Sequence, residues 1–139
     1  MTGSRKVKTY VLDTSAILTF LKAEPGVEVL DELFRGRDNR YIISFLTLYE
    51  IYYTTFRNHS KSAADFLLKT TMQLGLEVNY ENELDEVISA GIIRGLLPIS
   101  PVGAWIASLA YRKRATLVHK DPEFEALKDH IDLLSLLSK

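Results

Sequence analysis

Short apolar runs alternate with longer stretches of helical periodicity along the chain, and this alternation restricts its fold more than any other feature. Strands are predicted at Val7–Leu12, Tyr41–Ser44, Leu76–Asn79 and Thr116–His119, with a possible edge strand at Ile131–Leu134. Successive strands joined by helices are usually parallel neighbours, because a parallel pair needs a long crossover connection. The pattern therefore predicts an α/β fold with a largely parallel sheet.

The segments between these runs carry apolar residues at helical spacing and residues that start or stop helices. Pro25-Gly26 separates the first two segments, Gly75 is a plausible helix stop, and Pro101 suits a first helical turn. Helices are predicted over Ser15–Lys22, Val27–Phe34, Leu46–Asn58, Ser62–Leu74, Leu84 to about Gly95, Val102–Arg112 and, as a short helix, Pro122–Leu127. The sequence shows no repeat, low-complexity segment or linker, so we expect residues 1–139 to form one domain.

Composition narrows the chemistry that such a domain can perform. The chain has 139 residues, of which 47% are hydrophobic and 25% charged, as in an ordinary globular protein. It contains no cysteine, which excludes disulfides, zinc–thiolate sites and cysteine nucleophiles. A bound metal would need oxygen or imidazole ligands, which favours Mg²⁺ or Mn²⁺. Met1–Lys8 lacks the apolar stretch of a signal peptide and no run reaches transmembrane length, so we expect a cytoplasmic protein without a membrane partner.

The formal net charge is −1, so the chain is not a general cationic binder of nucleic acids. Contacts with RNA or DNA would have to come from local basic clusters, although each of these is also explained as a solvated helix end or loop. The clusters are Arg5, Lys6 and Lys8; Arg35, Arg37 and Arg40; Arg57, His59 and Lys61; and Arg112, Lys113 and Arg114.

Acidic residues follow three of the predicted strands. Asp13 ends the first, Glu50 comes shortly after the second, and Asp121 comes just after the fourth. In open α/β sheets the functional crevice lies beyond the carboxyl ends of the strands. Carboxylates that converge there suit a hard divalent cation, which gives up its water only to strong oxygen donors.

Helix capping offers a second explanation for each of these acids. Asp13 can cap the helix that follows it, although the next two residues carry hydroxyls that could do so instead, which favours a site role. Thr47 and Glu50 fit a capping box, and Asp121 precedes a proline as a helix cap often does. Taken alone, capping is favoured for Asp121 and equally plausible for Glu50. The occurrence of all three acids at strand exits favours a common site.

Three segments resemble, in order, sequence motifs of the PIN domain family. The segments are YVLDTSAIL (Tyr10–Leu18), LTLYEIY (Leu46–Tyr52) and TLVHKDPEF (Thr116–Phe124). The first places the opening metal-binding aspartate at Asp13, the second places the glutamate at Glu50, and the third places the late aspartate at Asp121. Each motif alone is weak, but their order and spacing are specific. Over almost its whole length the chain is similar to VapC-like toxins, the ribonucleases of type II toxin–antitoxin systems.

This resemblance implies a structure, an activity and partners. The fold would be a three-layer α/β/α arrangement with a mostly parallel sheet of four or five strands. The activity would be RNA cleavage dependent on Mg²⁺ or Mn²⁺, with Asp13, Glu50 and Asp121 as metal ligands and catalytic groups. RNA, a small antitoxin that covers the acidic site, and a second copy of the chain would be the partners. Residues expected to line the site are Thr14, Ser15 and His119, and residues expected to contact RNA are Arg112, Arg114 and Lys120.

Ser15, His119 and the aromatic residues of the long predicted helix also have simpler structural explanations. Ser15 is as plausible as a helix cap, and a histidine at the end of a strand more often makes an ordinary hydrogen bond than a functional contact. The aromatic residues of the long helix are expected to lie mainly in the core, with the remainder available to a partner. They are Phe45, Tyr49, Tyr52, Tyr53 and Phe56.

One expected carboxylate is missing. The third family motif has an aspartate in a context like S-x-x-D-A-x-I-A, whereas the chain has Gly103 in the segment Ser100–Ala107. Glycine costs a helix about 1 kcal/mol relative to alanine, and no turn explains its presence. Either the chain is a divergent family member, or an aspartate has been replaced, which is the favoured explanation.

The missing carboxylate is expected to impair this chain. Asp13 and Asp121 can still hold Mg²⁺ weakly, because the ion keeps several waters. The attacking water would be misplaced, and an error of about 1 Å can cost about 100-fold in rate. Gly103→Asp should then restore activity. The alternative is a degenerate PIN module that binds RNA or assembles with proteins. An aspartyl-phosphate enzyme is disfavoured, because no second aspartate closely follows Asp13.

Overall fold

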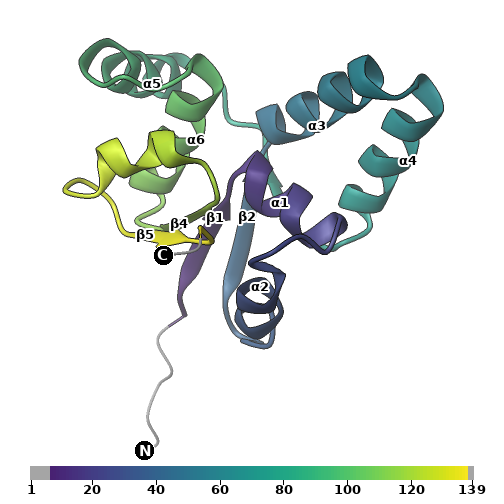
Figure 1. Cartoon of the computed structure of the whole chain (residues 1–139). Helices are drawn as coiled ribbons and strands as arrows, with labels where there is room; N and C mark the ends of the chain where they lie inside the picture. The colour runs from purple at the N-terminus through teal and green to yellow at the C-terminus, as the bar shows by residue number, and fades with distance from the viewer. Residues whose placement is uncertain (1–6, 138–139) are drawn as a thin grey trace, which may run out of the picture.

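The structure, a computed structural model, describes residues 7–137, in which helices flank a central sheet (Figure 1). The predicted clustering of Arg5 and Lys6 with Lys8 lies partly outside the described residues. In chain order the elements are β1 (Thr9–Leu12), α1 (Thr14–Leu21), α2 (Val27–Leu33), β2 (Arg40–Ser44), α3 (Phe45–Asn58), α4 (Lys61–Met72), β3 (Glu77–Asn79), α5 (Leu84–Leu96), α6 (Pro101–Arg112), β4 (Thr116–His119), the 3₁₀ helix η1 (Pro122–Leu127) and β5 (Leu133–Ser135).

Within residues 7–137 the sheet has five strands in the order β3-β2-β1-β4-β5, and every pairing is parallel. Val11 in the central strand pairs with Ile42 of β2 on one side and with Leu117 of β4 on the other. The prediction of a largely parallel α/β fold is confirmed. The edge strand begins two residues later than predicted, at Leu133, where it pairs with Leu117.

The chain builds the sheet outward from β1 in two directions, first to β2 and β3 and then to β4 and β5. The direction therefore reverses between β1 and β4. Such a switch point leaves an open crevice beyond the carboxyl ends of the two strands, because their connections leave toward opposite sides. The residues that follow β1 and β4, among them Asp13 and Asp121, meet at this crevice.

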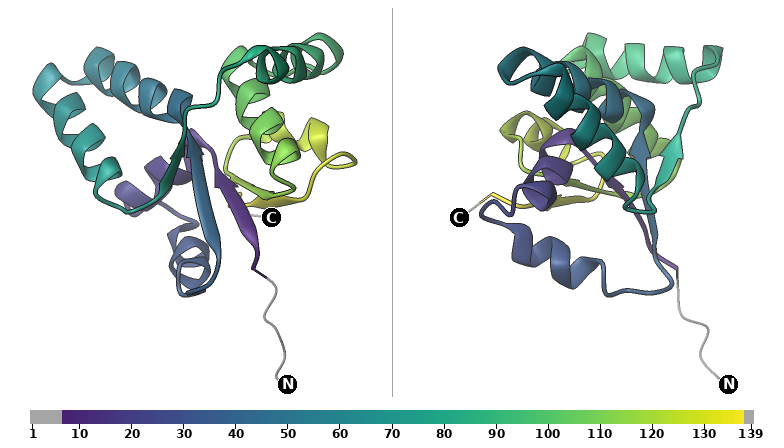
Figure 2. Two further views of the ribbon diagram at one scale, coloured as in Figure 1. Left: turned by 180° about the vertical axis from the view of Figure 1, so that it is seen from behind. Right: turned by 90° about the vertical axis from the view of Figure 1, so that its right-hand side faces the viewer.

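Alternate residues of each strand point to opposite faces of the sheet, and each face has its own hydrophobic core. Val11 and Leu117 pack with Ile106 and other residues of α6, while Leu12 and Val118 pack against α1, α2 and α3. Figures 1 and 2 show α1 to α4 on one side of the sheet and α5, α6 and η1 on the other. The expected three-layer arrangement is confirmed.

The start of α3 differs from the prediction. Ser44, the last residue of β2, caps the helix by accepting a hydrogen bond from Leu46 N at 3.1 Å. The capping box predicted for Thr47 and Glu50 is therefore wrong. Thr47 lies within the first turn and is fully buried, and Glu50 lies one turn further along the helix.

The aromatic residues of α3 are not core residues, contrary to the prediction. None of the five is fully buried, and the exposed fractions of Tyr49 and Phe56 are 59% and 53%. The reason is that α3 turns its other side inward, with Leu48, Ile51 and Thr55 buried. An aromatic surface is consequently left on this helix.

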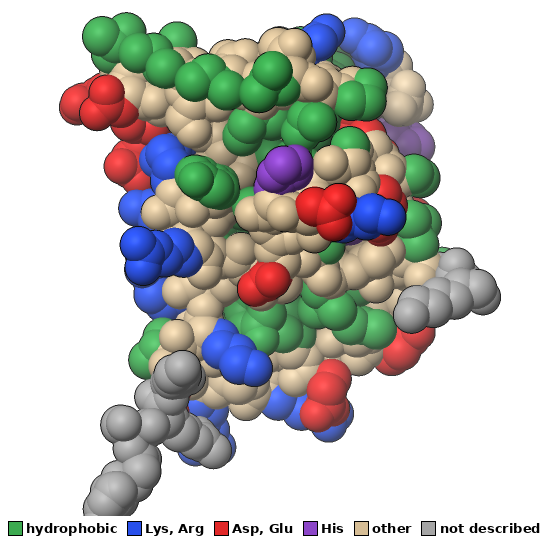
Figure 3. Space-filling model, turned by 90° about the vertical axis from the view of Figure 1, so that its left-hand side faces the viewer, with side chains coloured by type: hydrophobic (Ala, Val, Ile, Leu, Met, Phe, Trp, Pro, Cys, Tyr) green, Lys and Arg blue, Asp and Glu red, His purple; other side chains and the backbone are tan. Residues whose placement is uncertain are grey.

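A second apolar surface lies on α5. Its exposed side chains include Leu84, Val87, Ile88, Ile92 and Leu96. Figure 3, which faces the side of α5 and α6, shows hydrophobic side chains along the top of the molecule, where α5 lies. In the described part of the chain no single helix has the length and apolar character to cross a membrane. One pair of consecutive helices, α5 and α6, has sufficient length and apolar character when taken together, but the two helices are bent by 119° relative to each other.

We expect Thr47→Val to raise the free energy of unfolding by about 1 kcal/mol, measured by urea denaturation. The hydroxyl of Thr47 has no hydrogen-bond partner among the described residues, so burying it is unfavourable, whereas valine has the same shape without the polar atom. The matched variant Thr47→Ser keeps the hydroxyl, loses a packed methyl group and should be less stable than wild type. A Thr47→Val variant that is less stable than wild type would contradict this account.

Candidate active site

A cleft of about 460 Å³ lies beyond the carboxyl ends of β1 and β4. Four carboxylate residues line it, namely Asp13, Glu50, Asp121 and Glu123. The structure thus brings together all three acids predicted from the sequence and adds a further one. They come from the start of α1, the second turn of α3 and the segment that opens η1.

Asp13 is held at the switch point by backbone and side-chain hydrogen bonds. Its N–H donates to the carbonyl of Val118 at 3.1 Å, which ties the exit of β1 to β4. Its carboxylate caps α1 by accepting from Ala16 N at 2.8 Å and from the Ser15 hydroxyl at 2.8 and 2.7 Å. The expectation that Thr14 or Ser15 would cap this helix instead is wrong. Capping and membership of the cleft coexist in one side chain.

Burial raises the pKa of Asp13 from its ordinary 3.8 to about 7. The hydrogen bonds from Ser15 and Ala16 oppose this rise, and the negative charge of Asp121 adds to it. Only 3% of Asp13 is exposed, so little solvent screens the charge. The cleft therefore holds a carboxylate that is unfavourable to ionise unless a positive charge approaches.

Glu50 lines the same cleft from α3. The Thr14 hydroxyl donates a hydrogen bond to its Oε1, which ties the first turn of α1 to α3. Burial raises the pKa of Glu50 most, Thr14 opposes this, and the charges of Glu123 and Asp121 raise it further. The acids of the cleft are thus close enough to repel one another.

Asp121 and Glu123 enter the cleft from η1. Asp121 caps η1 by accepting from Glu123 N at 3.0 Å, so the capping role expected for it is confirmed. Glu123 accepts at Oε1 from Ser100 N at 2.7 Å and at Oε2 from the Ser100 hydroxyl at 2.9 Å. Its carboxylate is therefore fastened to the first turn of α6. Its place two residues after Asp121 is the only hint in the sequence that it belongs to the site.

Gly103 lines the cleft in the first turn of α6, where its N–H donates to the Ser100 hydroxyl at 3.0 Å. The sequence offers no structural reason for glycine here, but the structure does. A Cβ added at this position would lie 2.6 Å from Oε2 of Glu123 and 2.8 Å from Oγ of Ser100. The space of the expected aspartate is thus filled by the carboxylate of Glu123.

The three residues expected to line the site have different positions. Thr14 and Ser15 line the cleft, and the Ser15 hydroxyl also accepts from Lys120 N at 2.9 Å. His119 is buried and is not among the described residues that line the cleft. It packs against Phe124 with ring centroids 5.4 Å apart, and its Nε2 lies 3.7 Å from Oε1 of Glu125.

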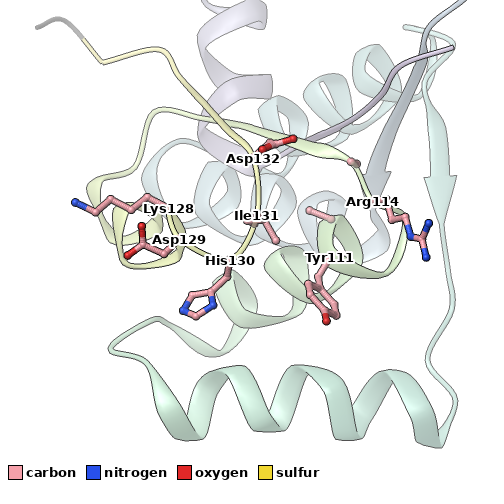
Figure 4. A pocket seen from close by; sticks show the side chains of 9 residues that line it. Tyr111, Arg114, Lys128, Asp129, His130, Ile131 and Asp132 are labelled. Atoms are coloured by element: carbon pink, nitrogen blue, oxygen red, sulfur yellow. The ribbon is translucent and has the colours of Figure 1, made fainter. Parts of the chain in front are cut away.

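The cations expected to contact RNA do not reach the cleft. The side chain of Lys120 donates to the carbonyl of Pro25 at 2.6 Å, and Arg112 contacts Ser108 and Glu81. Arg114 lines a separate hollow with Tyr111, which Figure 4 shows beside the segment that follows η1. From Gly103 to Tyr111, α6 rises about 12 Å, so the hollow and the cleft lie at opposite ends of the helix.

Other polar residues of the cleft were not assigned to it from the sequence. They are Lys22, Thr54, Thr55, Asn58 and Ser100, together with His59, which the sequence placed only in a basic cluster. Helical spacing was the available signal, because Lys22 lies seven residues after Ser15 and Asn58 eight residues after Glu50, each about two turns along one helix face. Among the described residues that line the cleft, Lys22 is the one lysine facing four acids.

The side chains that line this cleft offer the oxygen donors of a hard-cation site, but they are not arranged as a complete set of metal ligands. All four acids offer oxygen, and burial, with a smaller contribution from neighbouring carboxylates, raises the pKa of Asp13 and of Glu50. Within residues 7–137, however, no three Asp, Glu or His side chains are grouped as a metal would require. The oxygen donors that line the cleft nevertheless suit an ion such as Mg²⁺ or Mn²⁺, because such an ion keeps several waters and needs only one or two direct carboxylates.

A parallel α/β sheet with carboxylates gathered at its switch point defines a class of small proteins with an acidic cleft. Within that class the assignment is specific, because a family model of the PIN domain matches residues 10–129. The chain belongs to the PIN domain family, and the resemblance found in its motifs is confirmed. PIN domains are generally nucleases. No curated protein matches the chain.

Solved structures share this fold. VapBC-1 from nontypeable Haemophilus influenzae matches with a TM-score of 0.74 and 23% identity, over 92% of this chain and 98% of that one. DNA-bound VapBC from Salmonella typhimurium matches with a TM-score of 0.72 and 23% identity, over 94% and 99%. VapBC2 from Rickettsia felis, bound to a DNA fragment from its promoter, matches with 0.71 and 21%, over 91% and 98%. At these identities the likeness concerns the fold.

We expect Asp13→Asn to stabilise the metal-free protein at high pH and not at low pH. Because the folded state raises the pKa of Asp13 above 3.8, its stabilising proton is present below pH 3.8 and is lost as pH rises through about 7. Asparagine does not titrate, so the difference in unfolding free energy should be near zero at pH 4 and level off above pH 7. At about 1.36 kcal/mol per pH unit, its upper limit is about 4 kcal/mol.

Chemical denaturation in EDTA from pH 4 to 9 measures this difference. Asp31→Asn is the matched control, since Asp31 is exposed on α2, away from the cleft. A difference in unfolding free energy between Asp13→Asn and wild type that does not change with pH would refute the raised pKa of Asp13 as its cause.

Proposed function

We propose that this chain is a Mg²⁺- or Mn²⁺-dependent endoribonuclease, the toxin of a toxin–antitoxin pair that acts in the cytoplasm. The observation that carries the proposal is the gathering of carboxylates from three strand exits around Asp13, a group buried where its charge is unfavourable. Proteins keep such an arrangement where a cation or a reaction uses it. Membership of the PIN domain family, whose members are generally nucleases, supports the same conclusion.

In this proposal Asp13, Asp121 and Glu50 hold the cation directly or through water. A bound Mg²⁺ or Mn²⁺ would supply an acidified water and would neutralise charge on the phosphate. The protein's own part is orientation. Ser15 and Ala16 fix the carboxylate of Asp13, and Thr14 fixes that of Glu50, so that their oxygens need little rearrangement.

The RNA backbone would lie along the rim of the cleft formed by α1 and the end of α3. Lys22 and His59 line this rim and carry the positive or polar groups that a phosphate needs. Contacts of this kind do not depend on base identity and weaken with salt. Arg112 and Arg114 would serve only an RNA that extends along α6.

The partners would be a small antitoxin and a second copy of the chain. The three structural matches named above are VapBC proteins, and each shares the fold. The acidic cleft suits a basic side chain from an antitoxin, and the aromatic surface of α3 and the apolar face of α5 offer area for two interfaces.

A degenerate PIN module is the second candidate function. Gly103 favours it, because α6 contributes no carboxylate of its own to the cleft. Such a module would bind RNA equally well with chelator present and would not cut it.

We expect the purified chain to cut total RNA in MnCl₂ or MgCl₂ and to stop cutting in EDTA. Asp13→Asn and Glu50→Gln should each lower the rate at least about 100-fold, because each removes charge that holds the cation or orients the water. Asp31→Asn should cut like wild type. RNA binding without cutting, unchanged by EDTA, would establish the degenerate module instead.

We expect Lys22→Ala to weaken RNA binding and to lower the slope of log affinity against log salt by about 1, as one lost phosphate contact should. Fluorescence anisotropy in increasing NaCl measures this, in a Glu50→Gln background to prevent cutting. Arg114→Ala is the comparison and should change neither quantity. The opposite result, a loss confined to Arg114→Ala, would place RNA at the far end of α6.

A further inference from the structure

Glu123 lies in the cleft but has no part in the proposed set of three cation-holding acids. Its carboxylate is held at two points by the first turn of α6, at 2.7 Å from Ser100 N and 2.9 Å from Ser100 Oγ. The Ser100 hydroxyl in turn accepts from Gly103 N. A short chain of hydrogen bonds thus leads from α6 to a side chain of η1.

The carboxylate and a side chain at position 103 exclude each other. An added Cβ would lie 2.6 Å from Oε2 of Glu123, closer than real Cβ contacts come. Glutamate is flexible and could swing away, but only by giving up two hydrogen bonds to Ser100, one of them to a backbone donor at a helix start. Gly103 is therefore the residue that allows Glu123 to occupy this place.

The position suits a negative charge for two reasons. The first turn of α6 carries the positive end of the helix dipole and no acidic residue of its own, so an anion from elsewhere is favoured there. The same charge acts inside the cleft, because it contributes to the raised pKa of Glu50. The Glu123 carboxylate therefore contacts the start of α6 on one side and faces the remaining acids of the cleft on its other side.

We propose that Glu123 is an additional cation ligand of this cleft, direct or through water, and that it takes the place of a carboxylate at position 103. Gly103 then does not leave the site without a fourth carboxylate, because η1 supplies that carboxylate instead of α6. The ligand role rests on the proposed function, whereas the steric pairing of Gly103 with Glu123 does not. The competing explanation is that Glu123 only braces η1 against α6.

Titration calorimetry of the full chain with MnCl₂ separates the two explanations. Glu123→Gln keeps the size and one acceptor for Ser100 N but removes the charge and the second acceptor, and we expect it to lower Mn²⁺ affinity about tenfold. Glu125→Gln is the matched control, since Glu125 also lies in η1 but faces His119 outside the cleft, and its affinity should stay within about twofold of wild type. Equal affinity of Glu123→Gln and wild type would overturn the ligand role.

Placing a carboxylate at position 103 of α6 tests whether Glu123 takes the place of a carboxylate there. Gly103→Asp alone should lower the melting temperature and should not raise Mn²⁺ affinity, because Glu123 already fills the space. Gly103→Asp combined with Glu123→Ala should bind Mn²⁺ at least about tenfold more tightly than Glu123→Ala alone. A gain in affinity from Gly103→Asp alone, without loss of melting temperature, would overturn the proposal.

A thermal cycle tests the steric pairing without any metal. In EDTA, Gly103→Ala should lower the melting temperature of wild type by more than that of Glu123→Ala, because removing Glu123 relieves the closest contact of the added Cβ while Ser100 Oγ at 2.8 Å and Ile99 Cγ1 at 3.0 Å remain. Equal shifts in both backgrounds would overturn the pairing. If wild type bound no Mn²⁺, the proposed function would fail together with the ligand role, and this cycle would still decide the pairing.

Discussion

The parallel pairing of β1 with both β2 and β4 is the constraint on which the rest of the structure depends. It buries Val11 and Leu12 on opposite faces and leaves the exit of β1 at the centre of one sheet edge. Asp13 has no freedom to lie elsewhere, since its N–H continues the ladder to Val118. Because the other acids follow neighbouring strands, the same pairing brings them to Asp13. The acidic cleft is thus a consequence of strand order.

Burying Asp13 is unfavourable, and the local structure reduces that cost without removing it. The hydrogen bonds that cap α1 favour the ionised carboxylate, yet burial still raises its pKa to about 7. Capping and function are therefore not alternatives at this position. The cap holds the side chain in one orientation, and the remaining electrostatic strain is what a cation would relieve. Under the proposed function, this unfavourable burial holds a carboxylate where a cation would bind.

Periodicity and turn residues were sufficient to predict the strands, the helices and the three acids at strand exits. Each of these depends on spacing within one segment or on the order of segments. Two failures have different causes. Ser44 caps α3 in place of Thr47 because β2 runs directly into the helix, whereas His119 is buried against Phe124 of η1, a contact between segments. The contact between Glu123 and α6 joins residues 23 positions apart, beyond any local pattern.

A cation responds to where oxygen atoms lie, not to which element supplies them. The first turn of α6 and the start of η1 border the same space, and a Cβ at position 103 would lie 2.6 Å from Oε2 of Glu123, so a side chain there requires Glu123 to move. A substitution at Gly103 consequently has a meaning only together with the residue at 123. This coupling explains why a motif can lose its acid while its surroundings stay intact: the neighbours of Gly103 still build the helix start that holds the carboxylate of Glu123.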